Sequence, residues 1–128
     1  MIYPKIETLY DRDENFKVIP GKFKNRAYDI IKTWQFTEKI DGMNMRIIWD
    51  GAKMSFGGKT DNAQSPGDLV KYMYELVSPV KLGVIFQGTP AVIYGEGYGG
   101  SIQKCGKIYG PDKSFAAFDV LVDNRWWM

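Results

Sequence analysis

The sequence predicts an α+β protein built on an antiparallel sheet. Aromatic residues make up 15% of the chain, a share that suits a β-rich core or a surface that stacks on flat ligands. Short runs of aromatic and β-branched residues are bounded by turn residues, whereas helical spacing is clear in only one stretch. The length of 128 residues fits one domain that covers residues 1–128.

The first third of the chain carries weak structural signals. Residues 1–25 are predicted to be irregular, because prolines and a glycine interrupt a segment of mixed charge. Residues 26–33 suit a short helix or a short strand. Residues 34–40, WQFTEKI, are rich in aromatic and β-branched residues and are predicted to form a strand. The loop KIDGMN follows at residues 39–44.

The middle of the chain predicts a hairpin and then a helix. Residues 44–59 contain two strand-like runs around an Asp-Gly pair at residues 50–51, which is a strong hairpin signal. The helix is expected to begin with Ser65 as its cap and Pro66 at its first position, and to end before Pro79. Its apolar positions at helical spacing are Leu69, Met73, Leu76 and Val77.

The last third of the chain predicts two longer strands. Residues 91–100 read as a strand that runs into a glycine-rich turn, and residues 113–123 read as a strand that is apolar enough to be buried. Asp123 and Asn124 indicate a turn, after which residues 125–128 begin a further strand.

The composition narrows the chemistry that the chain can perform. A formal net charge of +2 is too small by itself to indicate nucleic-acid binding. The single cysteine excludes an internal disulfide and fits a reducing, cytoplasmic compartment. The chain has no histidine, so a zinc site and a histidine-dependent triad are implausible, which leaves lysine, carboxylates, tyrosine and bound metal. The polar N-terminus is not a signal peptide, and no apolar run predicts a membrane span.

The tetrapeptide KIDG at residues 39–42 has two interpretations. One is a surface turn in which Lys39 pairs with Glu38 or Asp41. The other is a nucleophilic lysine, which must lose its proton and therefore needs burial or neighbouring cations to lower its pKa. Taken alone the tetrapeptide favours the turn, because short motifs recur by chance.

The wider pattern EKIDGMN resembles motif I of the covalent nucleotidyltransferases, which are the polynucleotide ligases and mRNA capping enzymes. The lysine of that motif attacks the α-phosphate of a nucleotide and holds the nucleotide as a phosphoramidate. DNA ligases and capping enzymes usually have arginine five positions after the lysine, whereas this chain has Asn44. The combination is similar to the ATP-dependent RNA ligases of the phage double-strand-sealing type.

Three further stretches resemble the same family, in the family's order. FGGKTDNAQ is similar to the Arg-Thr-Asp segment that contacts the nucleotide, with Lys59 at the arginine position. Lysine keeps the charge of arginine but lacks its planar fork. VIYGEGYGG resembles motif III and contains Glu96, and SFAAFDVLV resembles motif IIIa, where Phe118 precedes Asp119. The opening YPKIETLYDRD also looks like the start of these ligases.

The resemblance implies an antiparallel-sheet nucleotidyltransferase fold of the ATP-grasp-like type. It implies an enzyme that seals 5′-phosphate to 3′-hydroxyl RNA ends, nicked or single-stranded, through a lysyl-AMP intermediate. ATP and Mg²⁺ (or Mn²⁺) are the implied cofactors, and no side chain is assigned as a metal ligand. The implied catalytic residues are Lys39, Asp41 and Glu96, and the implied nucleotide-binding residues are Glu38, Ile40, Asn44, Lys59, Glu96, Phe118 and Asp119.

The resemblance also suggests what each of these residues does. Glu38 and Phe118 are expected to hold the adenine, with Glu96 on the ribose hydroxyls and Asp41 shaping the loop of Lys39. The residues themselves leave other interpretations open. Glu96 also suits a solvent-facing strand position, Phe118 a core position, and the glycines around Glu96 a close backbone approach or a bulge.

Motifs IV and V of the family are not found in these 128 residues. The expectation is therefore a fold that is incomplete at its C-terminus, in a fragment or truncated product that is a poor ligase by itself. One alternative is a non-catalytic nucleotide- or RNA-binding remnant. A DNA ligase or capping-type enzyme is disfavoured by Asn44, and a β-rich interaction protein by the ordered motifs.

Overall fold

The computed structural model describes residues 1–127. The chain divides into two compact units: Pro4–Glu38 forms the smaller one, and Met1–Tyr3 together with the chain from Lys39 onward forms the larger one. No helix within residues 1–127 is both long and apolar enough to cross a membrane.

The smaller unit consists of a hairpin and a short helix. Strands β1 (Tyr10–Arg12) and β2 (Val18–Phe23) pair antiparallel, and the rings of Tyr10 and Phe23 stack with centroids 5.4 Å apart. The 3-10 helix η1 (Arg26–Ile30) follows, so residues 26–33 contain a helix rather than a strand.

Two predictions for this part of the chain are wrong. Residues 1–25 are not irregular throughout, because the Asp13 carboxylate accepts hydrogen bonds from the backbone N–H groups of Asn15 and Lys17, at 2.9 and 2.8 Å, and so closes a hairpin turn. Residues 34–40 form no strand. Strand propensity is expressed only where a neighbouring strand provides a partner, and no described segment pairs with these residues.

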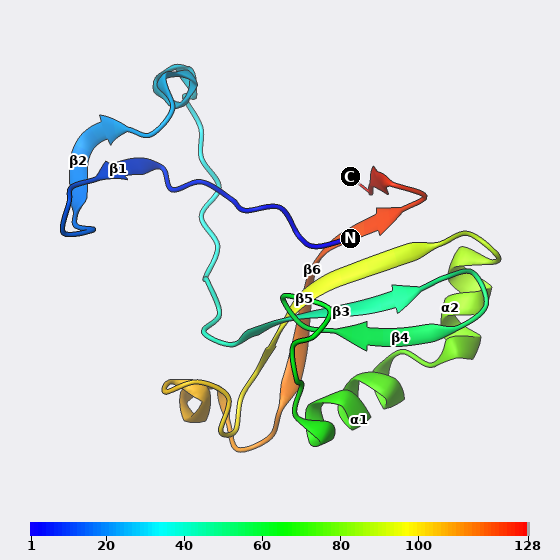
Figure 1. The fold of residues 1–128 in the computed structure, drawn as a ribbon. Helices are drawn as coiled ribbons and strands as arrows, with labels where there is room; N and C mark the ends of the chain where they lie inside the picture. Colours follow the sequence, from blue (N-terminus) through cyan, green and yellow to red (C-terminus); the bar gives the residue numbers. More distant parts are fainter. Residues whose placement is uncertain (128) are drawn as a thin grey trace. The chain divides into compact units, whose positions relative to one another are not determined.

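The larger unit is an antiparallel sheet with strand order β4-β3-β5-β6-β7 (Figure 1). This arrangement confirms the α+β class with an antiparallel sheet. Its strands are β3 (Met43–Trp49), β4 (Met54–Gly57), β5 (Ala91–Tyr98), β6 (Ser114–Val122) and β7 (Arg125–Trp126). Its helices are α1 (Gly67–Leu76), α2 (Pro79–Phe86) and the 3-10 helix η2 (Gly106–Tyr109).

The predicted hairpin and the two later strands are confirmed. At the β3–β4 turn, the Asp50 carboxylate accepts from the N–H groups of Ala52 and Lys53 at 2.8 and 2.7 Å, and Gly51 has a φ of 103°. The turn between β6 and β7 lies at Asp123 and Asn124, where both residues have positive φ. Turn chemistry is a local property, so the sequence signal and the structure agree at these two points.

The helical region differs from its prediction in two ways. Helix α1 begins at Gly67 rather than at Pro66, and the Ser65 hydroxyl donates to the Met45 sulfur at 3.3 Å rather than capping the helix. Pro79 does follow α1, but it also begins α2, whose cap is the Ser78 hydroxyl that accepts from Lys81 N–H at 3.3 Å. The second helix is an addition to the predicted fold.

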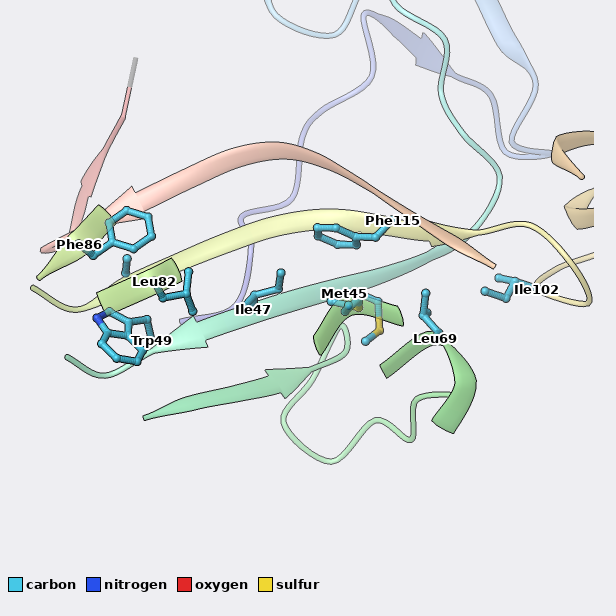
Figure 2. Packing of buried hydrophobic residues seen from close by; sticks show 10 residues of the cluster. Met45, Ile47, Trp49, Leu69, Leu82, Phe86, Ile102 and Phe115 are labelled. Atoms are coloured by element: carbon cyan, nitrogen blue, oxygen red, sulfur yellow. The ribbon is translucent and has the colours of Figure 1, made fainter. Parts of the chain in front are cut away.

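The hydrophobic core lies between the two helices and one face of the sheet. In Figure 2, the side chains of Met45, Ile47 and Trp49 of β3 lie on the face of the sheet that the helices cover. They belong to one buried cluster with Leu69 of α1 and Leu82 of α2. Leu69, Met73 and Leu82 have no exposed surface, whereas Leu76, another of the apolar positions at helical spacing, is 42% exposed. The face of the sheet that carries these β3 residues is therefore covered by the helices.

Candidate active site

The face of the sheet opposite the two helices, here called the open face, carries the predicted site residues that lie on strands. Successive side chains of a strand point to opposite faces, so Asn44 and Arg46 lie on the open face, between the core residues of β3. The register continues this arrangement across the sheet. Asn44 lies opposite Glu96, and Arg46 lies opposite Tyr94, which in turn lies opposite Asp119.

Glu96 lies at the centre of one group of predicted residues. Its carboxylate accepts a hydrogen bond from the Asn44 side-chain amide at 3.0 Å and another from the Gly42 backbone N–H. Burial raises the pKa of Glu96 above its usual value, while the Lys39 ammonium and these two donors oppose the rise and the Asp41 carboxylate adds to it. Glu96 is half-buried, so it is not the solvent-facing strand residue that its type alone would suggest.

The loop that carries Lys39 is held against strand β5 by a close backbone approach at Gly42. A Cβ added at Gly42 would lie 2.2 Å from the Gly97 carbonyl oxygen and 2.9 Å from the Glu96 Cγ. Only glycine allows this contact, which brings the exposed Lys39 within electrostatic reach of Glu96.

A second contact fixes the same loop from helix η2. The backbone N–H of Asp41 donates to the Tyr109 hydroxyl at 3.1 Å, and the Tyr109 ring packs edge-on against Tyr98 with centroids 5.4 Å apart. The Asp41 backbone is therefore part of the support of the Lys39 loop, although its carboxylate is exposed to solvent.

Phe118 and Asp119 form a second group on the open face. The register between β5 and β6 shifts at this point, because Tyr94 lies opposite Asp119 while Gly95 lies opposite Ala117, so Phe118 is the extra residue of a β-bulge. A bulge redirects the side chain of its extra residue. Phe118 is 47% exposed and is therefore not a core phenylalanine.

The side chains of Tyr3 and Trp126 complete this second group. The Tyr3 hydroxyl donates to the Asp119 carboxylate, and the Tyr3 ring packs edge-on against Phe118 with centroids 5.1 Å apart. Trp126 of β7 packs against Tyr3 and Tyr94 at 5.6 and 5.5 Å. Asp119 therefore has the partner that a partly buried carboxylate needs.

Arg46 is a buried cation on the open face. It is 3% exposed, and its guanidinium donates to the carbonyls of Gly58 at 2.9 Å and Met1 at 3.1 Å and to the Asp61 carboxylate at 2.8 Å. Gly57 leaves the room for it, since a Cβ there would lie 2.8 Å from a guanidinium nitrogen. Arg46 thereby anchors the segment after β4, which carries Lys59.

The remaining predicted residues are less closely joined to these two groups. Lys59 is exposed, and the segment around it is fixed through its neighbour Asp61. Ile40, which stands between the exposed Lys39 and Asp41 in the sequence, is half-buried. Glu38 is the last residue of the smaller unit, so its part in the site stays a prediction.

The glycines around Glu96 serve the core rather than a ligand. Gly95 and Gly97 lie on the helix-covered face, where an added Cβ would come within 2.3 Å of the Phe115 ring and 2.4 Å of a Leu69 methyl group. Gly99 has a φ of 87° and forms the turn after β5. Both interpretations of these glycines apply, because the side chains of Phe115 and Leu69 approach Gly95 and Gly97 closely, and Gly95 also lies at the register shift between β5 and β6.

Sequence reasoning missed Tyr3, Arg46, Tyr94, Tyr109 and Trp126. Only Arg46 gave a usable signal, because a charged residue inside the run MNMRIIW must find partners if the strand is buried. The tyrosines reach the site through contacts between distant parts of the chain, which local patterns do not show.

A resident metal does not fit the described side chains. Within residues 1–127, no group of three or more histidine, cysteine, aspartate or glutamate side chains could hold a metal ion. Magnesium is often bound by one or two carboxylates together with substrate phosphates. A magnesium site of that kind would not need such a group.

Comparison with known proteins identifies the family of the chain. The family model described as RNA ligase matches residues 32–128. A search of curated proteins finds no match. Among solved structures, the chain is similar to a lysine-to-methionine mutant of the Naegleria gruberi RNA ligase, which was solved with AMP and Mn. The TM-score is 0.52, and the sequence identity is 17% over 70% of this chain. A likeness at this identity shows the fold alone. The present chain covers 27% of that protein, so it corresponds to part of its length. Since the family model matches more than half of the chain, the chain belongs to the RNA ligase family.

Proposed function

We propose that this chain carries the nucleotide-binding and lysine-adenylylating part of an ATP-dependent RNA ligase. The observation that carries the proposal is the grouping of Lys39, Asn44 and Glu96 around Gly42, in a chain of the RNA ligase family. Lys39 lies on an exposed loop beside the half-buried Glu96 carboxylate, so the positive charge that a nucleophilic lysine needs nearby would have to come from a metal ion bound with the nucleotide.

In the proposed first step, the neutral amine of Lys39 forms a bond with the α-phosphorus of MgATP. The bond from that phosphorus to the bridging oxygen breaks, pyrophosphate leaves, and the amine proton passes to solvent. The 5′-phosphate of an RNA end then takes the AMP from Lys39, and a 3′-hydroxyl displaces the AMP and seals the strand.

The other residues receive roles from their positions. Glu96 can accept hydrogen bonds from the ribose hydroxyls, with Asn44 orienting its carboxylate. Phe118 offers an exposed aromatic face to the adenine, and Glu38 is proposed to contact the same base. Asp41 shapes the Lys39 loop through its backbone contact with Tyr109, and Lys59 would neutralise phosphate charge.

The direct test is to incubate the chain with Mg²⁺ and ATP that is radiolabelled at the α-phosphate, and to separate the products on a denaturing gel. The proposal predicts a labelled protein band that is lost in Lys39→Arg and kept in Lys71→Arg, which changes an exposed lysine of helix α1. A band that persists in Lys39→Arg would refute the assignment of the nucleophile. Adding nicked RNA or nicked DNA to the labelled protein then separates an RNA ligase from a DNA ligase.

A nucleotide-binding remnant is the alternative outcome of the same experiment. It would give no labelled band, while equilibrium dialysis would still detect AMP binding. Asn44 and Glu96 would hold the ribose in that case too, so Glu96→Ala should weaken dialysis binding under either function.

A further inference from the structure

The first three residues of the chain lie on the open face of the sheet, at the group formed by Phe118 and Asp119. Figure 1 shows the N-terminus beside strand β6. The Met1 carbonyl accepts hydrogen bonds from the Arg46 guanidinium at 3.1 Å and from the Tyr94 hydroxyl at 3.0 Å. The Tyr3 hydroxyl donates to Asp119. The segment is thus tied to strands β3, β5 and β6 at once.

The Tyr3 ring also makes contacts, with three other aromatic rings. Its centroid lies 5.1 Å from those of Tyr94 and Phe118 and 5.6 Å from that of Trp126, in tilted or edge-on geometry. Edge-on aromatic pairs attract one another, because the positive ring edge meets the negative ring face. Tyr3 therefore joins the bulged strand β6 to its neighbours on this face.

Phe118 and Asp119 need such support. Phe118 is the extra residue of a bulge and is 47% exposed, so neither strand pairing nor the core fixes its ring. An exposed phenylalanine that must offer one face to a ligand loses rotational freedom on binding, unless a neighbour has already fixed it.

We propose that Tyr3 is a positioning residue of the nucleotide site. Its hydroxyl fixes Asp119, and its ring fixes Phe118, so that the aromatic surface for the base exists before the nucleotide arrives. This inference rests on the proposed nucleotide site. The Tyr3 hydroxyl is protonated at neutral pH even at the ordinary pKa of tyrosine, and burial followed by the hydrogen bond to Asp119 raises that pKa to about 12.

The proposal predicts an effect on nucleotide affinity rather than on the chemistry at Lys39, because Tyr3 supports the base-binding group. Loss of the ring in Tyr3→Leu should raise the half-saturating ATP concentration about tenfold, as expected when edge-on ring pairs are removed. Tyr3→Phe keeps the ring, loses the bond to Asp119 and should give a smaller rise. The rate of Lys39 labelling at saturating ATP should stay within about twofold of the unaltered chain in both variants.

The experiment measures the rate of Lys39 labelling against ATP concentration for the unaltered chain, Tyr3→Leu and Tyr3→Phe. Tyr74→Phe is the matched control, since Tyr74 is 52% exposed on helix α1. Equilibrium dialysis with AMP, in a Lys39→Arg background, supplies a second measurement that needs no chemistry. Thermal unfolding of each variant shows that it is folded.

The possible outcomes separate this proposal from the proposed function. Weaker AMP binding in the Tyr3 variants, with labelling absent even from the unaltered chain, would support the role of Tyr3 and refute the ligase chemistry. Equal affinities in all variants would overturn the role of Tyr3, whatever the labelling shows. A fall in the saturating rate with unchanged half-saturation would also overturn it, because Tyr3 would then act on the reacting lysine.

Discussion

The substitution Gly42→Ala tests the physical basis of the candidate site. The new Cβ would lie 2.2 Å from the Gly97 carbonyl oxygen and 2.9 Å from the Glu96 Cγ, whereas an ordinary contact between heavy atoms needs about 3.5 Å. The Gly97 carbonyl belongs to strand β5, where Gly97 lies opposite Met43 in the sheet. Because the sheet resists movement more than a loop does, the Lys39 loop should shift by about 1 Å.

That shift would strain two hydrogen bonds of the loop: from the Gly42 N–H to Glu96 and from the Asp41 N–H to Tyr109. A hydrogen bond contributes about 0.5–1.5 kcal/mol, so the free energy of unfolding should fall by about 2 kcal/mol. A catalytic group displaced by 1 Å can lose about a hundredfold in rate, so Lys39 labelling should slow by about that factor.

Urea unfolding and the initial rate of Lys39 labelling measure the two effects. Gly67→Ala is the matched control, because a Cβ at Gly67 meets nothing within 4 Å and alanine favours the helix that begins there. If Gly42→Ala matched the unaltered chain in both urea midpoint and labelling rate, the close approach would not be what positions Lys39.

Three further predictions follow from the same contacts. Burial raises the pKa of Glu96, so the folded state favours the protonated carboxyl, and the stability that this provides is lost as pH rises through the folded pKa. Glu96→Gln should therefore unfold at a higher urea concentration than the unaltered chain at pH 7, and this advantage should disappear in acid. The same variant should show slower labelling of Lys39. The pKa of Tyr3 is raised from 10.0 to about 12, so its contribution to stability should be present below pH 10 and disappear between about pH 10 and 12, which a comparison with Tyr3→Phe in thermal melts would detect. Leu69→Ala should lower the free energy of unfolding by about 2–5 kcal/mol. Gly97→Ala should lower it less in the Leu69→Ala background than alone, because the Leu69 methyl group 2.4 Å from the new Cβ is then gone. Additive losses in a double-mutant cycle would contradict this.

Local signals account for the parts of the fold that were correctly predicted. The Asp50 turn depends on hydrogen bonds between residues at most three positions apart, and the sequence contains all of them. Residues 34–40 show the opposite case, since their strand propensity has no partner strand within the described chain. The sequence pattern does not predict helix α2, because Pro79 also marks the end of α1, while Ser78 before it caps the next helix.

The candidate site likewise contains residues that the sequence indicated and residues that only the folded structure brings to it. The family resemblance implied Lys39 and Glu96, and the register of β3 and β5 with the contact at Gly42 brings the two residues close together. The contact of Tyr3 with Asp119 joins residues 116 positions apart, and no local pattern encodes it. Resemblance identified the residues expected to touch the nucleotide, whereas the residues that hold them emerged only from the fold.

The alternation of strand β3 links the core to the site. Met45 and Ile47 are 1% exposed and pack under the helices, while Asn44 and Arg46 contact Glu96 and the segment after β4 on the open face. A shift of one residue in the β3–β5 register would bury Asn44 and expose Met45, so the register cannot slip without a large cost in buried apolar surface. The pairing of Asn44 with Glu96 is thus fixed by the hydrophobic residues on either side of Asn44, and the precision of the polar site derives from the core beneath it.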